Sequence, residues 1–141
     1  MVSQVAPSRL LLVCVAALCL PGCRAEKPPR PQEVVVWHQV GAWSGRGNKQ
    51  TETFTSDTGG FRVRWATTNE TATDAGTLKV IIRSADSGRE IVEAVDARGI
   101  DSDEAIVAAE RPRWYYLTID SANVDWTVSI DERIEGQRVS K

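Results

Sequence analysis

Apolar and polar residues alternate along three segments of the chain, which is the pattern of β-strands that bury one face. In the first segment Phe61, Val63 and Trp65 alternate with two arginines. Residues 78–83 and 124–131 alternate in the same way. Their apolar positions are Leu78, Val80 and Ile82 in the one, and Val124, Trp126, Val128 and Ile130 in the other. The pattern predicts half-buried antiparallel strands at all three places.

Weaker strand patterns fill the intervals, at residues 33–40, 50–55, 90–96, 104–109 and 114–120. Residues that favour turns separate them, chiefly glycine, asparagine, aspartate and proline. About eight short strands at this spacing predict an all-β fold, an antiparallel β-sandwich of jelly-roll or immunoglobulin-like type. We place this domain at residues 34–134 and expect a polar C-terminal tail at 135–141.

The composition after residue 33 agrees with this fold. Valine and isoleucine together number 20, leucine 2 and threonine 11, and branching at Cβ favours a pleated strand over a helix. The formal net charge is −2, from 17 basic and 19 acidic residues. That balance excludes a strongly basic nucleic-acid-binding surface.

The first 22 residues have the layout of a signal peptide, with Arg9 followed by an uncharged run from Leu10 to Leu20. Eleven helical residues would reach only about 16 Å, half of a bilayer's hydrocarbon core. Cys23 follows directly and is the predicted lipidation site. Ordinary cleavage near Ala25 and a retained N-terminal anchor are the alternatives. Residues 23–33 contain three prolines and predict an extended linker between the lipid anchor and the domain.

Five tryptophans in so small a domain are its most suggestive chemical feature. Trp65 and Trp126 lie on apolar strand faces and are expected in the core. Trp43 lies between glycines in a predicted loop, where we expect its ring to be exposed to solvent. Trp114 with Tyr115 places aromatic rings on both faces of one strand, so that at least one ring is expected at the surface. We therefore single out Trp43, Trp114 and Tyr115 as candidate ligand-binding residues, with packing in the core as the alternative.

Other chemistry-bearing residues give weaker signals. Asp101, Asp103 and Glu104 cluster in one predicted loop, either as a solvated acidic turn or as a calcium site. The single histidine, His38, has no partner that would indicate a metal or catalytic site, so no catalytic residue is assigned. The glycines of residues 45–49 are not followed by a helix and so indicate a turn rather than a phosphate loop. No cofactor is expected.

Basic residues also recur at polar positions of two predicted strands. They are Arg62, Arg64, Lys79 and Arg83. We expect them to form a solvated outer face, and a basic patch for anionic polymers or lipid headgroups is the alternative.

Leu20, Pro21, Gly22 and Cys23 resemble the lipobox of bacterial lipoproteins. Segments 44–54, 60–65, 115–117 and 124–128 resemble a small, uncharacterised all-β domain of bacterial secreted proteins and lipoproteins. The resemblance implies a palmitate-bearing lipoprotein of the cell envelope that faces the periplasm or the exterior, with no known activity. We expect a membrane-anchored binding or interaction module, with a polysaccharide or an envelope protein as its partner. A carbohydrate- or cell-wall-binding module is the alternative, and a hydrolytic enzyme a distant one.

Overall fold

A computed structural model describes Gly22 and residues 33–109 and 114–137. The chain divides into two units, Met1–Arg30 and Pro31–Lys141, and the second holds all the strands described here. They are β1 (Glu33–Arg46), β2 (Lys49–Gln50), β3 (Phe54–Thr55), β4 (Gly60–Thr68), β5 (Thr77–Ser84), β6 (Glu90–Arg98), β7 (Ser102–Ala108), β8 (Trp114–Ala122) and β9 (Asp125–Gln137). Residues 1–21 of the predicted signal peptide, Cys23 and most of the linker lie outside the described residues.

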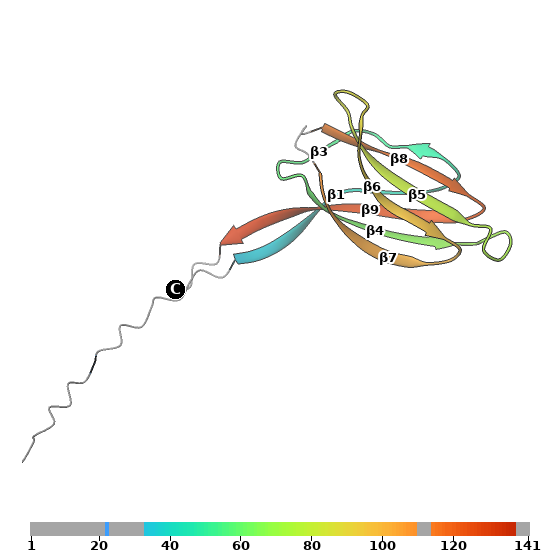
Figure 1. Cartoon of the computed structure of the whole chain (residues 1–141), viewed down its shortest axis with the longest axis horizontal. Helices are drawn as coiled ribbons and strands as arrows, with labels where there is room; N and C mark the ends of the chain where they lie inside the picture. The colour runs from blue at the N-terminus through green and yellow to red at the C-terminus, as the bar shows by residue number, and fades with distance from the viewer. Residues whose placement is uncertain (1–21, 23–32, 110–113, 138–141) are drawn as a thin grey trace, which may run out of the picture. The chain divides into compact units, whose positions relative to one another are not determined.

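The strands form two antiparallel sheets packed face to face, which confirms the predicted all-β sandwich (Figure 1). The first sheet, called sheet A, has the order β1-β9-β4-β7. The second, sheet B, has the order β2-β8-β5-β6, with β3 paired to β8 outside that path. The described part of the chain forms nine strands rather than about eight, because residues 51–53 interrupt the strand expected at 50–55.

The predicted alternation places the expected side chains in the core. Val124, Trp126, Val128 and Ile130 are each at most 1% exposed, as are Leu78, Val80 and Ile82. Trp65 is only partly buried, although it packs against the core. Ile81 is an exception on the polar face of β5: it is 8% exposed, beside an irregularity in the pairing of β5 with β6.

A cluster of aromatic rings fills one part of the core. The Phe54 ring stacks on Tyr115 at a centroid distance of 5.9 Å, and Phe61 meets Tyr115 edge to face at 5.1 Å. Trp43 joins the cluster through Phe54, at 5.8 Å. Such contacts stabilise a core beyond the apolar area that they bury.

Our prediction that Trp43 is solvent-exposed is wrong: its side chain is 9% exposed. A β-bulge explains the error. Gln39 pairs with Asp131 and Gly41 with Ile130, so Val40 is an extra residue in β1 and the strand changes which of its residues face inward. Beyond the bulge the inward positions are Gly41, Trp43 and Gly45.

The two glycines that suggested a loop are strand residues that make room for indole rings. A Cβ added at Gly41 would overlap the Trp43 ring, and one at Gly45 would meet Cζ2 of Trp126 at 3.0 Å. Glycine in a strand often marks this kind of close approach. The Trp43 Nε1–H then donates a hydrogen bond to Glu52 Oε1 at 2.8 Å.

The first part of β1 and the last part of β9 continue past the sandwich as a two-stranded ribbon (Figure 1). β4 pairs with β9 only as far as Glu132, whereas β1 pairs with β9 as far as Gln137. The strand therefore extends three residues into the segment that we assigned to a polar tail, of which residues 138–141 are not described. The ribbon exposes Val35, Val36 and Ile134.

The buried side chain of Glu132 holds the turn at residues 56–58 against the sandwich by hydrogen bonds. Its Oε1 accepts hydrogen bonds from Ser56 Oγ at 2.6 Å and from the backbone amides of Asp57 and Thr58 at 2.7 and 2.9 Å. Burial by itself would raise the pKa of Glu132. The hydrogen bonds lower the pKa by more than burial raises it, so it lies below the usual value. The ionised carboxylate is thus part of the folded structure.

Candidate functional site

Of the three aromatic residues singled out from the sequence, the structure exposes one. Trp114 is 52% exposed, whereas Tyr115 is fully buried because neighbouring strand residues point to opposite faces. The expectation that one ring of the Trp114–Tyr115 pair is at the surface is therefore met by Trp114. The rings of Tyr115 and Trp43 both belong to the aromatic core. The structure does not bring the three residues together as one surface.

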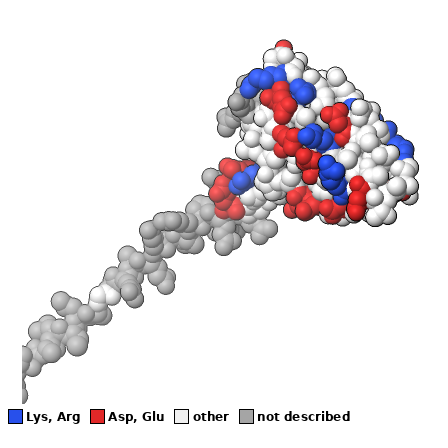
Figure 2. Space-filling model, turned by 45° about the vertical axis from the view of Figure 1, so that its right-hand side comes forward, with Lys and Arg blue, Asp and Glu red and all other residues white. Residues whose placement is uncertain are grey.

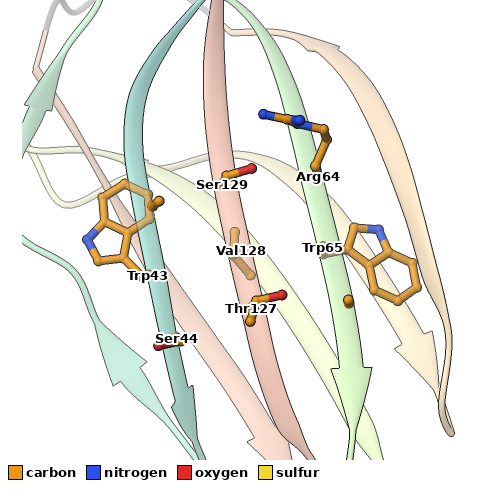
Figure 3. A pocket seen from close by; sticks show the side chains of 9 residues that line it. Trp43, Ser44, Arg64, Trp65, Thr127, Val128 and Ser129 are labelled. Carbon is orange, nitrogen blue, oxygen red and sulfur yellow. The ribbon is translucent and has the colours of Figure 1, made fainter.

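A groove lies instead on the outer face of sheet A, where β1, β9 and β4 run side by side (Figure 3). It encloses about 510 Å³. A second hollow of about 310 Å³ shares Ser44 and Thr127 with it and continues to Asp125. The groove crosses the strands, which lie about 4.8 Å apart, so that its three strands span roughly 10 Å.

Small side chains create this groove. Two cross-strand rows face outward, with Ala42 beside Ser129, and Ser44 beside Thr127 and then Ala66. The neighbouring residues Trp126 and Val128 point into the core, which turns the residues between them outward. Long side chains would fill the space above the sheet, whereas alanine, serine and threonine leave it open.

The floor of the groove carries three hydroxyl groups among apolar side chains. Ser44, Thr127 and Ser129 present hydroxyl groups that form no hydrogen bond with any other described residue. Each hydroxyl can both donate and accept. The groove can therefore hydrogen-bond a polar ligand without first breaking bonds within the described part of the protein.

Charged groups stand at both ends of the groove. At one end Arg62 and Arg64 share the carboxylate of Asp131. At the other, Arg46 Nη1 lies 2.9 Å from Asp125 Oδ1, and Asn69 Nδ2 donates to Asp125 Oδ2 at 2.6 Å. The hydrogen bond from Asn69, followed by that from Arg46, lowers the pKa of Asp125.

The basic residues predicted on one solvated face lie on two different sheets. Arg62 and Arg64 are on sheet A, and Lys79 and Arg83 are on sheet B. Lys79 Nζ lies 3.2 Å from Glu93 Oε2, and Arg83 Nη2 lies 3.7 Å from Glu90 Oε2. The hydrogen bond and charge of Glu93 raise the pKa of Lys79. Figure 2 accordingly shows acidic and basic side chains interleaved, without a single basic patch on the visible face.

Two aspartates of the acidic cluster accept hydrogen bonds from the backbone amides of the residues that directly follow them. Asp101 Oδ1 accepts a hydrogen bond from the Ser102 amide at 2.8 Å, and Asp103 Oδ1 accepts one from the Glu104 amide at 2.7 Å. β7 is an edge strand, and aspartates that occupy edge amides discourage pairing with other chains. Within residues 33–109 and 114–137, no group of three or more potential ligands is placed to hold a metal ion.

His38 lies on β1, an edge strand of sheet A, with an exposed side chain. It is not among the residues that line the groove. The glycine-rich segment at residues 45–49 forms the short connection between β1 and β2, and Gly47 has a positive φ of 78°. The predicted turn is therefore present there, although β1 extends into it as far as Arg46.

The groove residues that bear hydroxyl groups were not singled out from the sequence. Thr127 and Ser129 are recognisable from the sequence as outward positions of an alternating strand. The small size of their side chains does not by itself indicate a groove. The signal is that five outward positions on three strands are small, and recognising it requires knowing that residues near 43, 65 and 128 are neighbours. Only the strand pairing supplies that knowledge.

The fold and the groove define a small two-sheet antiparallel β-sandwich, with a groove on the outer face of one sheet that carries three hydroxyl groups. Comparisons with protein families, with curated proteins and with solved structures found no match to this chain. The resemblance to a small all-β domain thus holds at the level of the fold alone.

Proposed function

We propose that this chain is a non-enzymatic binding module of the cell envelope that holds an extended polysaccharide in the groove of sheet A. The observation that carries the proposal is the band of small side chains, three of which bear hydroxyl groups, that leaves a groove on the outer face of sheet A. A polymer of hydroxylated rings can lie across such strands and exchange hydrogen bonds with the serine and threonine hydroxyls.

The groove supports this ligand better than the aromatic surface expected from the sequence. Trp114 remains exposed and can stack on a sugar, but it lies on β8 of sheet B and does not line the groove. A sugar platform of three rings would need Trp43 and Tyr115 at the surface. The hydroxyls of sheet A need no rearrangement.

The character of the groove also favours binding over catalysis. Its described lining consists of methyl groups, hydroxyls, three inward-pointing apolar residues and the Arg64 guanidinium. None of these lining residues is a histidine, cysteine or carboxylate, the side chains that most often act as general bases. Hydroxyls without a base beside them bind and orient a ligand.

We further propose that the module is anchored in a membrane by a lipid on Cys23. The support is the signal-peptide pattern and the lipobox-like residues that precede Cys23, which lies outside the described residues. Among the residues that the structure describes, no helix is long and apolar enough to cross a membrane. A diacyl anchor would give stable attachment by itself.

The groove is tested with the full chain against a panel of immobilised neutral and acidic polysaccharides and isolated cell-wall sacculi. Thr127→Met places a longer, uncharged side chain in the middle of the groove and should abolish retention. Thr55→Met, on β3 of the other sheet, changes an exposed threonine in the same way and should leave retention unchanged. Equal retention of the two variants, or no retention of the unaltered protein on any polymer, would refute the proposal.

A further inference from the structure

At one end of the groove, two basic side chains contact a single acidic side chain. Arg62 Nε and Nη2 donate to Asp131 Oδ2 at 2.9 and 2.7 Å, and Arg64 Nη2 donates to Asp131 Oδ1 at 3.2 Å. Two guanidinium groups thus share one carboxylate. Because the Asp131 side chain is 3% exposed, its charge is enclosed, and the surplus positive charge belongs to the arginines.

Arg62 is held in place and has little freedom to bind anything else. Besides its two hydrogen bonds to Asp131, its guanidinium lies 4.8 Å from the centroid of the Trp37 ring, a distance at which the cation and the ring attract. Its side chain is 24% exposed. Arg62 therefore supplies the neutralising partner of Asp131.

Arg64 carries the surplus charge into the groove. Its side chain is 48% exposed and extends from β4 towards β9, above Ser129 (Figure 3). Within the described part of the chain only its Nη2 has a partner. Its Nε and Nη1 remain to bind a ligand. Glu104 lies opposite Arg64 on the far side, on β7, and forms no ion pair with it among the described residues.

On the basis of the proposed function, we infer that the groove selects a polysaccharide that bears carboxylate groups. A guanidinium presents its N–H groups in a planar fork that matches a carboxylate. Asp131 holds Arg64 in position before the ligand arrives, so that little side-chain entropy is lost on binding. The hydroxyls of Ser44, Thr127 and Ser129 then bind the hydroxyl groups of the same polymer.

Polygalacturonate and its fully methyl-esterified form provide a matched pair of probes, because they share one backbone and differ in charge. The full-length protein should bind polygalacturonate and bind the ester at least tenfold more weakly. Arg64→Met should weaken polygalacturonate binding about tenfold to a hundredfold, the range for losing a hydrogen bond to a charged group. Arg64→Lys should recover part of the affinity, since it keeps the charge without the fork.

Arg98→Met is the matched control, since it removes one positive charge from sheet B and should leave the affinity unchanged. Circular dichroism shows whether each variant is folded. If both forms of the polymer bind equally, or if Arg64→Met binds like the unaltered protein, the carboxylate inference is wrong and the polysaccharide proposal stands. If polyglutamate binds as tightly as polygalacturonate, the groove selects charge without the sugar. If no polysaccharide binds, both proposals fail.

Discussion

Replacing Trp43 with alanine tests whether the bulge in β1 directs this residue into the core. The indole is 9% exposed and contacts Phe54 in the aromatic cluster. Truncating a buried tryptophan to alanine costs about 3–5 kcal/mol of unfolding free energy, because the apolar contact is lost and a cavity remains. A domain of this size has a total stability of roughly 5–15 kcal/mol. Trp43→Ala should therefore remove a large fraction of the domain's stability.

Urea denaturation followed by circular dichroism measures this loss. With a slope of about 3 kcal/mol/M, a loss of about 3 kcal/mol lowers the midpoint by roughly 1 M. Trp114→Ala is the control, since this ring is 52% exposed and its removal should cost about 1 kcal/mol or less. Equal midpoints for the two variants would show that Trp43 is not a core residue.

A double-mutant cycle with Gly41 tests the close approach directly. Gly41→Ala should destabilise the unaltered protein, because the added Cβ would overlap the Trp43 ring. In the Trp43→Ala background the ring is gone and the same substitution should cost much less. The two changes are then strongly non-additive. Additive costs, within about 0.5 kcal/mol, would refute the packing of this ring on the glycine.

Two further predictions concern Glu132 and Cys23. Glu132→Gln should cost about 1–3 kcal/mol at neutral pH, because hydrogen bonds to a charged group are weakened. The folded-state pKa of Glu132 is lowered, so its contribution is present above the unfolded-state pKa and is lost as the pH falls through the folded-state pKa. Urea midpoints from pH 7 to pH 3 should therefore fall more for the unaltered protein than for Glu132→Gln, and parallel curves would contradict this. Cys23→Ala should abolish incorporation of labelled palmitate in cells, and a labelled variant would disprove lipidation at this residue.

The strands and the fold class follow from the sequence because they depend on local information. Side chains two positions apart on a strand point to the same face, so alternation alone placed Trp126 in the core together with Val124, Val128 and Ile130. Branched side chains reinforced the same conclusion. The approximate positions of the strands could be predicted from this alternation and from the turn residues that flank each strand.

Trp43 shows where that local argument fails. Its face depends on one extra residue, Val40, and a bulge has no alternation pattern of its own. The bulge is defined by the pairing of β1 with β9, whose residues lie nearly ninety positions along the chain. In the sequence alone, glycines near a tryptophan indicate a loop. In this sheet the same glycines leave space for indole rings.

The groove and its charge were decided by tertiary structure alone. Ser44, Ala66 and Thr127 are unremarkable at their own positions and become a groove only because β1, β4 and β9 are neighbours. The same pairing brings Arg62 and Arg64 to one carboxylate, Asp131, and leaves Lys79 and Arg83 on the other sheet. Contacts between strands far apart in sequence thus determined which charges are neutralised and which one faces the groove.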